Sequence, residues 1–155
     1  MTRRRLRQGR RRDDERVVHV MHLVTFVEVD DPVANPRRLS VTARHEAVLS
    51  NSDRVLLLDD RGWSESIFTT DGSGPPDIWS TLTAGEIAAT ARVIVGPDEP
   101  FDGHSQEHME SSHWDTLTAV LQREGVDVEG MALSELPHEV VLGDELLARL
   151  RAGIG

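Results

Sequence analysis

The sequence predicts an α+β fold: an antiparallel or mixed sheet of three to four strands in the N-terminal half, packed against two to three helices in the C-terminal half. Apolar residues follow strand periodicity up to about residue 69 and helical periodicity after residue 83. The chain has 155 residues, of which 38% are hydrophobic, enough for one core. We therefore expect a single acidic domain over residues 17–155.

The first two strands are predicted from β-branched content and alternation. Residues 17–29 are apolar on both faces, which is typical of a central strand that is covered on two sides. Pro and Asp residues in 30–36 then predict a loop. Residues 41–49 alternate between apolar and polar positions, which predicts a half-buried strand.

A β-hairpin is predicted over residues 41–60. A turn at 50–53 separates the strand 41–49 from a short apolar run at 55–58. A weaker strand over 63–69 ends at a segment rich in Gly and Pro, residues 71–77, which predicts a loop.

Three helices are predicted from periodicity and from end signals. The first begins at a capping box, formed by Thr83 and Glu86, and stops at Gly96 and the Pro that follows it. The second runs over 105–125, with Ser at its N-cap and Gly at its end. The third is short and covers 144–153.

Several residue types are missing, and their absence excludes whole chemistries. The sequence has no Cys and no Tyr, and all 17 basic residues are Arg, so there is no Lys. These absences exclude disulfides, thiolate metal sites, Cys nucleophiles, Lys Schiff bases and Tyr acids or bases. The remaining candidates for chemistry are His and carboxylate side chains.

The charge is distributed unevenly. Residues 1–16 hold eight Arg and three acidic residues, a net charge of +5. The other nine Arg and 24 acidic residues give residues 17–155 a net charge of −15. A surface this acidic repels nucleic acids and attracts cationic proteins and metal ions.

Three interpretations of the leader, residues 1–16, stay open: a disordered, solvated arm, a mis-assigned start, or a basic arm that binds nucleic acid through phosphates. A signal peptide is not favoured, because polar residues interrupt the apolar run after the leader and no small-residue cleavage site follows. The sequence has no run of about 20 apolar residues, so we expect no membrane span and a cytoplasmic location.

One short motif suggests metal chemistry. The segment from His104 to His108, with Glu107 before the second His, resembles the H-x-x-E-H motif of inverzincin metalloproteases over five residues. The resemblance implies that the two His bind Zn or another divalent metal while Glu107 acts on a bound water. His113, Glu110 or Asp115 would complete the site. A metal-dependent hydrolase is therefore one alternative function.

The context of this motif favours a structural interpretation. Ser105 is the predicted N-cap, so His104 precedes the helix and does not share a face with His108. Helical phase separates His108 from His113 by about 140°. His45 lies on the apolar face of its strand and is expected to be a core histidine, and His138 follows a Pro and is expected to close a turn.

The favoured function is a non-enzymatic interaction or regulatory protein whose acidic surface binds a basic protein partner. Its expected contact residues are Asp59 and Asp60, at the exit of the hairpin, together with Asp77 and Trp79. The Trp residues are core fillers in an aromatic-poor chain, and Trp79 is the one expected to be partly exposed. Nucleic-acid binding through the leader is the second alternative.

Overall fold

The computed structural model describes residues 18–67 and 77–154, so the expectations for residues 1–16 and for nearly all of the loop 71–77 lie outside the described residues. The elements are β1 (Val20–Val29), β2 (Arg38–Leu49), β3 (Arg54–Ser66), the 3₁₀-helix η1 (Ile78–Ser80), α2 (Ala84–Ile94), α3 (Gln106–Arg123), α4 (Gly130–Ser134), β4 (His138–Leu142) and α5 (Asp144–Ile154).

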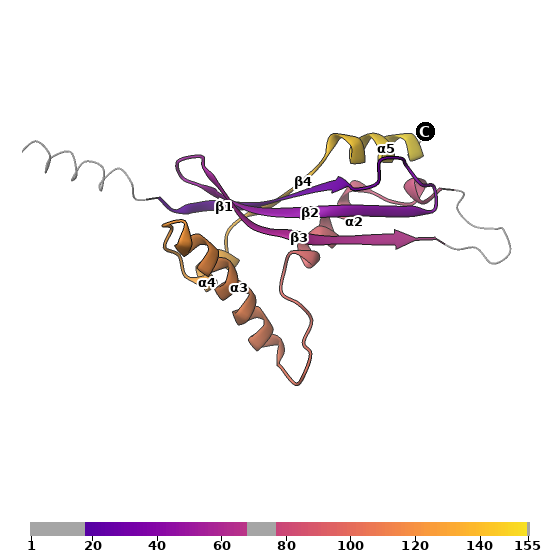
Figure 1. The fold of residues 1–155 in the computed structure, drawn as a ribbon. Coiled ribbons are helices and arrows are strands. Elements are labelled where there is room, and N and C mark those ends of the chain that lie inside the picture. The colour runs from indigo at the N-terminus through magenta and orange to yellow at the C-terminus, as the bar shows by residue number, and fades with distance from the viewer. Residues whose placement is uncertain (1–17, 68–76, 155) are drawn as a thin grey trace, which may run out of the picture.

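The four strands form one mixed sheet in the order β3-β2-β1-β4 (Figure 1). β1 pairs with β2 and β2 pairs with β3 in antiparallel fashion, whereas β1 and β4 are parallel. Residues 18–67 and 77–154 also form four α-helices, so the predicted α+β class is confirmed. None of the helices in the described ranges is both long and apolar enough to cross a membrane.

The two strands with the strongest sequence patterns are as predicted. β1 lies between β2 and β4, and it buries side chains on both faces, for example Val24 and Val27. β2 begins three residues before the predicted start and buries the expected alternating positions, from Val41 to Leu49. Alternation predicts β2 well because the side chains of a strand point to opposite faces in turn.

β3 corrects the prediction of two separate strands with Asp59 and Asp60 at the hairpin exit. Both residues lie within one continuous strand of 13 residues, at the edge of the sheet, and both are exposed. An edge strand tolerates consecutive charges because one side of its backbone faces solvent. Gly62 permits the pairing to continue, since a Cβ there would lie 2.6 Å from the carbonyl oxygen of Val41.

Three short elements were not predicted: η1, α4 and β4. Each has five residues or fewer, too short for a periodic pattern to stand out. The expectation that His138 closes a turn is wrong, because it is the first residue of β4 and pairs with Leu23 of β1. β4 forms because β1 presents a free edge to a chain segment far away in sequence.

The three predicted helices are confirmed, and local signals begin and end them. Thr83 and Glu86 form the expected capping box at the start of α2. Ser105 caps α3 by accepting a hydrogen bond from the backbone N–H of His108. Gly125, with φ of 84°, ends α3 in the left-handed conformation that favours glycine.

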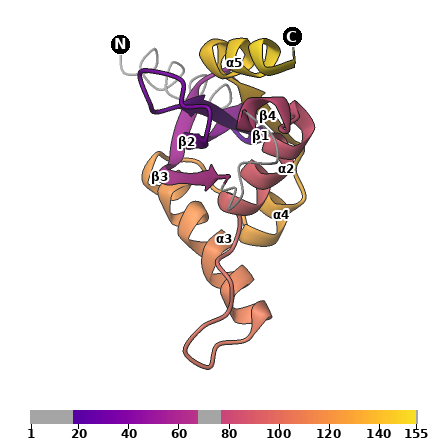
Figure 2. The same cartoon turned by 90° about the vertical axis from the view of Figure 1, so that its right-hand side faces the viewer.

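Two apolar clusters pack against one face of the sheet. One joins α2 and α5 to Val27, Val41 and Ala43, and the other joins α3 and α4 to Leu23 and Ala47. These strand residues share a face, because the register pairs Leu23 with Ala47 and Val27 with Ala43. In the view of Figure 2, α5 lies at the top and α3 at the bottom.

α5 buries Trp79, which corrects the expectation that this residue is partly exposed. Trp79 is only 3% exposed, and its indole N–H donates to the carbonyl oxygen of Asn35 at 2.9 Å. The guanidinium of Arg149, on α5, lies 5.8 Å from the ring centroid. Asp77 is half-buried and accepts the backbone N–H of Trp79, as the N-cap of η1.

Glu28 fixes the start of α5. Its Oε1 accepts the backbone N–H of Leu146 and that of Val29, both at 2.9 Å. We expect Glu28→Ala to lower the free energy of unfolding by about 1–2 kcal/mol, because a helix N-terminus loses a charged acceptor. Urea unfolding measures this loss. Glu139→Ala, on an exposed position of β4, is the matched control, and an equal loss in both variants would contradict the capping role.

Candidate functional site

A polar row separates the two apolar clusters on the helix-covered face of the sheet. Thr25 of β1 pairs with His45 of β2, between the pair Leu23 and Ala47 on one side and Val27 on the other. Thr25 is 0% exposed and His45 is 1% exposed. The prediction of a core histidine at position 45 is confirmed. A fully buried polar row of this kind requires internal hydrogen bonds.

The Thr25 hydroxyl supplies those hydrogen bonds. Its Oγ1 lies 2.8 Å from Nδ1 of His45 and 2.6 Å from Nε2 of His138. The two imidazole rings meet edge to face, with centroids 5.0 Å apart. A hydroxyl can donate one hydrogen bond and accept another. One neutral ring therefore accepts a hydrogen bond from the Thr25 hydroxyl, and the N–H of the other ring donates a hydrogen bond to it. This arrangement is complete when both rings are neutral.

Burial keeps this pair neutral. Burial, followed by the nearby His138, His113 and Arg61, lowers the pKa of His45 from 6.5 to about 3. Burial, and then the positive charge of Arg92, also lowers the pKa of His138. Both shifts oppose protonation, because burial disfavours a charged ring and the neighbouring positive groups repel a second charge.

His113 extends the polar region from α3. It is 9% exposed, and its Nε2 is buried without a hydrogen-bond partner among the described residues. Burial and then the charge of Arg61 lower the pKa of His113 to about 4, while Asp98 acts in the opposite direction. His113 therefore holds an unpaired, neutral nitrogen in the interior.

A cavity of about 120 Å³ adjoins His113. Its polar lining comes from Arg61 of β3, Asp98 and α3, and its apolar lining from Leu58, Met109 and Leu117. The Nη1 of Arg61 donates to the carbonyl oxygen of Ile94 at 2.8 Å. Sequence reasoning missed this cavity, because its residues come from β3, α3 and the loop between α2 and α3.

The residues of the zinc motif do not form a metal site, although two of them meet. His104 and His108 stack with ring centroids 4.3 Å apart, so the expectation that they lie on different faces is wrong: His104 precedes α3, and its ring lies against that of His108. Both rings are exposed, whereas His113 is buried. Glu107 and Glu110 are exposed on α3. In residues 18–67 and 77–154, no group of three His or carboxylate side chains is placed to hold a metal ion. The two His alone supply fewer protein ligands than zinc sites use.

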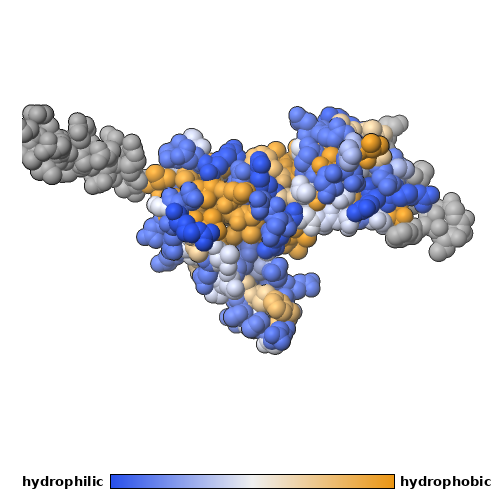
Figure 3. Space-filling view, in the orientation of Figure 1, coloured by the Kyte–Doolittle hydropathy of each residue, from blue (hydrophilic) through white to orange (hydrophobic). Residues whose placement is uncertain are grey.

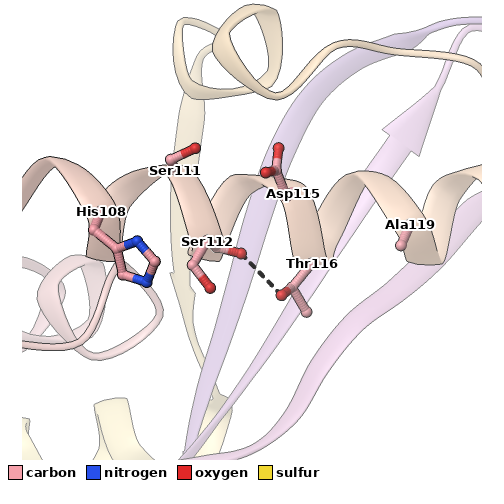
Figure 4. A pocket seen from close by; sticks show the side chains of 6 residues that line it. All are labelled: His108, Ser111, Ser112, Asp115, Thr116 and Ala119. Atoms are coloured by element: carbon pink, nitrogen blue, oxygen red, sulfur yellow. Dashed lines mark hydrogen bonds between the residues drawn. The ribbon is translucent and has the colours of Figure 1, made fainter. Parts of the chain in front are cut away.

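A larger hollow next to His108 is formed by one helix alone. Figure 4 shows its six residues along the surface of α3, with the Thr116 hydroxyl donating to the carbonyl oxygen of Ser112 at 2.9 Å. Because no second element contributes, the fold builds no enclosed site there.

The opposite face of the sheet carries a shielded aromatic ring. The guanidinium groups of Arg44 and Arg54 lie 5.5 and 5.4 Å from the ring centroid of Phe26, and both pair with Glu46. Leu56, opposite Glu46 in the register, is 45% exposed. Figure 3 shows an apolar area over the strands that hydrophilic residues border.

The fold and the site together define a class of protein: an α+β protein with a mixed four-stranded sheet, a buried polar row of Thr25 and His45, and a small cavity beside His113. Scans of the chain against protein-family models, curated proteins and solved structures found no match.

Proposed function

We propose that the protein is a non-enzymatic interaction protein that binds a basic protein partner through an acidic arm. The arm comprises residues 98–116, the loop before α3 and the first half of that helix. Its six acidic residues are all exposed, and it contains no Arg or Lys: Asp98, Glu99, Asp102, Glu107, Glu110 and Asp115. This one-sided charge is the observation that carries the proposal.

The shape of the arm supports this function. α3 extends away from the sheet, and the loop at its start lies at the far end of the molecule (Figures 1 and 2). Phe101, 60% exposed, meets the ring of His104 edge to face at 5.7 Å. An exposed aromatic ring among carboxylates suits an Arg-rich surface, since Arg pairs with carboxylates and stacks on rings.

One of the contact residues expected from the sequence joins this surface, because Asp60 lines the same depression as Asp98 and Glu99. Asp59 precedes Asp60 on β3 and is exposed, but it does not line that depression. Asp77 and Trp79 are engaged in η1 and in the core, so we leave both out of the proposed contact surface. The surface therefore runs from the middle of β3 to the first turns of α3.

The test compares two sets of charge-neutralising substitutions. Binding of a fluorescent Arg-rich peptide is measured by anisotropy at low and high salt. We expect Asp102→Asn, Glu107→Gln and Glu110→Gln together to weaken binding about tenfold at low salt, since each exposed ion pair contributes up to about 1 kcal/mol. High salt is expected to weaken binding of the wild-type protein as well.

The matched control is Asp127→Asn, Glu129→Gln and Glu135→Gln. All three residues are exposed; the first two precede α4 and the third follows it. It changes the net charge equally but leaves the arm intact. Equal weakening by both sets would show a general charge effect, and binding that ignores salt would contradict an electrostatic interface. Pull-down from lysate at both salt concentrations then identifies the natural partner.

A further inference from the structure

We propose that the cavity beside His113 binds a short-chain monocarboxylate, whose carboxylate lies between the Arg61 guanidinium and the His113 imidazole. The cavity shares Asp98 and His113 with the acidic arm, but it takes a small anion rather than a basic protein. Three features of the described residues carry the inference: an unpaired buried nitrogen, a guanidinium whose ion pairs are loose, and a cavity with polar and apolar lining residues.

The unpaired nitrogen indicates a missing partner. Nε2 of His113 has no hydrogen-bond partner among the described residues, although the residue is 9% exposed and lines the cavity. Buried polar atoms in folded proteins are almost always hydrogen-bonded, and the exceptions call for an explanation. A ligand oxygen in the cavity satisfies this nitrogen when the neutral ring carries its proton on Nε2.

Arg61 supplies the charge that selects an anion. Its side chain is 24% exposed, and its Nη1 donates to the carbonyl oxygen of Ile94 at 2.8 Å. Its two ion pairs are loose: Nε lies 3.6 Å from Asp60 and Nη1 lies 3.5 Å from Asp98. Both carboxylates belong to side chains that are more than half exposed, so they can turn to solvent. A bound carboxylate replaces them with the paired hydrogen bonds that guanidinium groups form best.

Size and lining select the kind of anion. A volume of about 120 Å³ corresponds to about four water molecules, which suits acetate or propionate. Leu58, Met109 and Leu117 provide apolar contacts for the carbon chain. Asp98 also lines the cavity and penalises a doubly charged anion such as phosphate more than a singly charged one.

The test titrates the full chain with sodium acetate and sodium propionate, with ionic strength held constant by sodium chloride. The His ring signals are followed by NMR. We expect saturable shifts of the His113 signals, with a dissociation constant on the order of millimolar. Arg61→Gln is expected to weaken binding about tenfold, because the charged, two-pronged contact is lost. Asp98→Asn is expected to strengthen binding about threefold, because it removes a competing carboxylate.

Two controls match these charge changes away from the cavity: Arg123→Gln at the end of α3 and Asp127→Asn between α3 and α4. Both are expected to bind as the wild type does. A gain of affinity in Asp98→Asn cannot come from misfolding, so it supports the site directly. Shifts that never saturate, saturation by phosphate but not by acetate, or equal effects in the controls would overturn the proposal.

Discussion

Replacement of Thr25 by Val is expected to lower the free energy of unfolding by about 2–4 kcal/mol, although the two side chains are nearly equal in volume. Val removes the hydroxyl that lies 2.8 Å from His45 and 2.6 Å from His138. The His45 nitrogen is then left unpaired at a position that is 1% exposed. His138 is only half-buried, and water can replace part of its lost hydrogen bond.

The matched control for this variant is Thr118→Val. Thr118 is also buried, but its hydroxyl donates to the backbone carbonyl oxygen of Trp114 within the same helix. Removing this hydroxyl therefore leaves no other side chain without a hydrogen-bond partner. We expect a loss of less than about 1 kcal/mol for this variant. Urea unfolding followed by Trp fluorescence gives both values. If Thr25→Val proved no less stable than the control, the polar row would have no structural role.

Acidification is expected to destabilise the protein through the same histidines. The pKa values of His45 and His113 in the folded protein are about 3 and about 4, below the 6.5 of an unfolded chain. As pH falls below about 6.5, these His side chains bind protons in the unfolded chain but not in the folded protein, so the unfolded state is favoured. The stability contributed by the neutral rings is therefore complete above pH 6.5 and is lost as pH falls toward 4 and 3.

The size of this effect is measurable in one variant. His45→Gln is expected to be less stable than the wild type at pH 7, because the contact with Thr25 changes. Between pH 7 and pH 5 the difference is expected to shrink by about 2 kcal/mol, since only the wild type loses stability through this residue. His19→Gln, which removes an exposed ring, is the control. A difference that stays constant with pH would contradict the low pKa of His45.

Local patterns were enough to predict much of the fold. β2 alternates, α2 has a capping box, and α3 is bounded by Ser105 and Gly125, so short-range interactions specify each of these elements. β4 was missed because five residues after a Pro hold no distinctive pattern of their own. Its pairing with β1 depends on a strand more than a hundred positions earlier in the chain.

The candidate sites divide in the same way. The acidic character of the chain is a property of its composition. The sequence alone was enough to propose Asp59 and Asp60 as contact residues, because they are consecutive acidic residues after an apolar run. The six carboxylates of the arm lie close together along the chain, within residues 98–116, whereas only the fold shows that α3 extends away from the sheet. The burial of Trp79 could not be predicted because it packs in a core cluster with residues that are distant in the sequence, such as Leu39 of β2 and Leu146 of α5.

The sequence by itself determined the fold class, the central place of β1, the main helices and the restriction of chemistry to His and carboxylate groups. Only the tertiary structure decided which His side chains lie close together in the folded protein. His104 and His108 are near each other along the chain but lie at the surface, whereas His45, His113 and His138 come from β2, α3 and β4 to one buried region. Strand register and helix packing bring these three together, and both depend on contacts between distant segments.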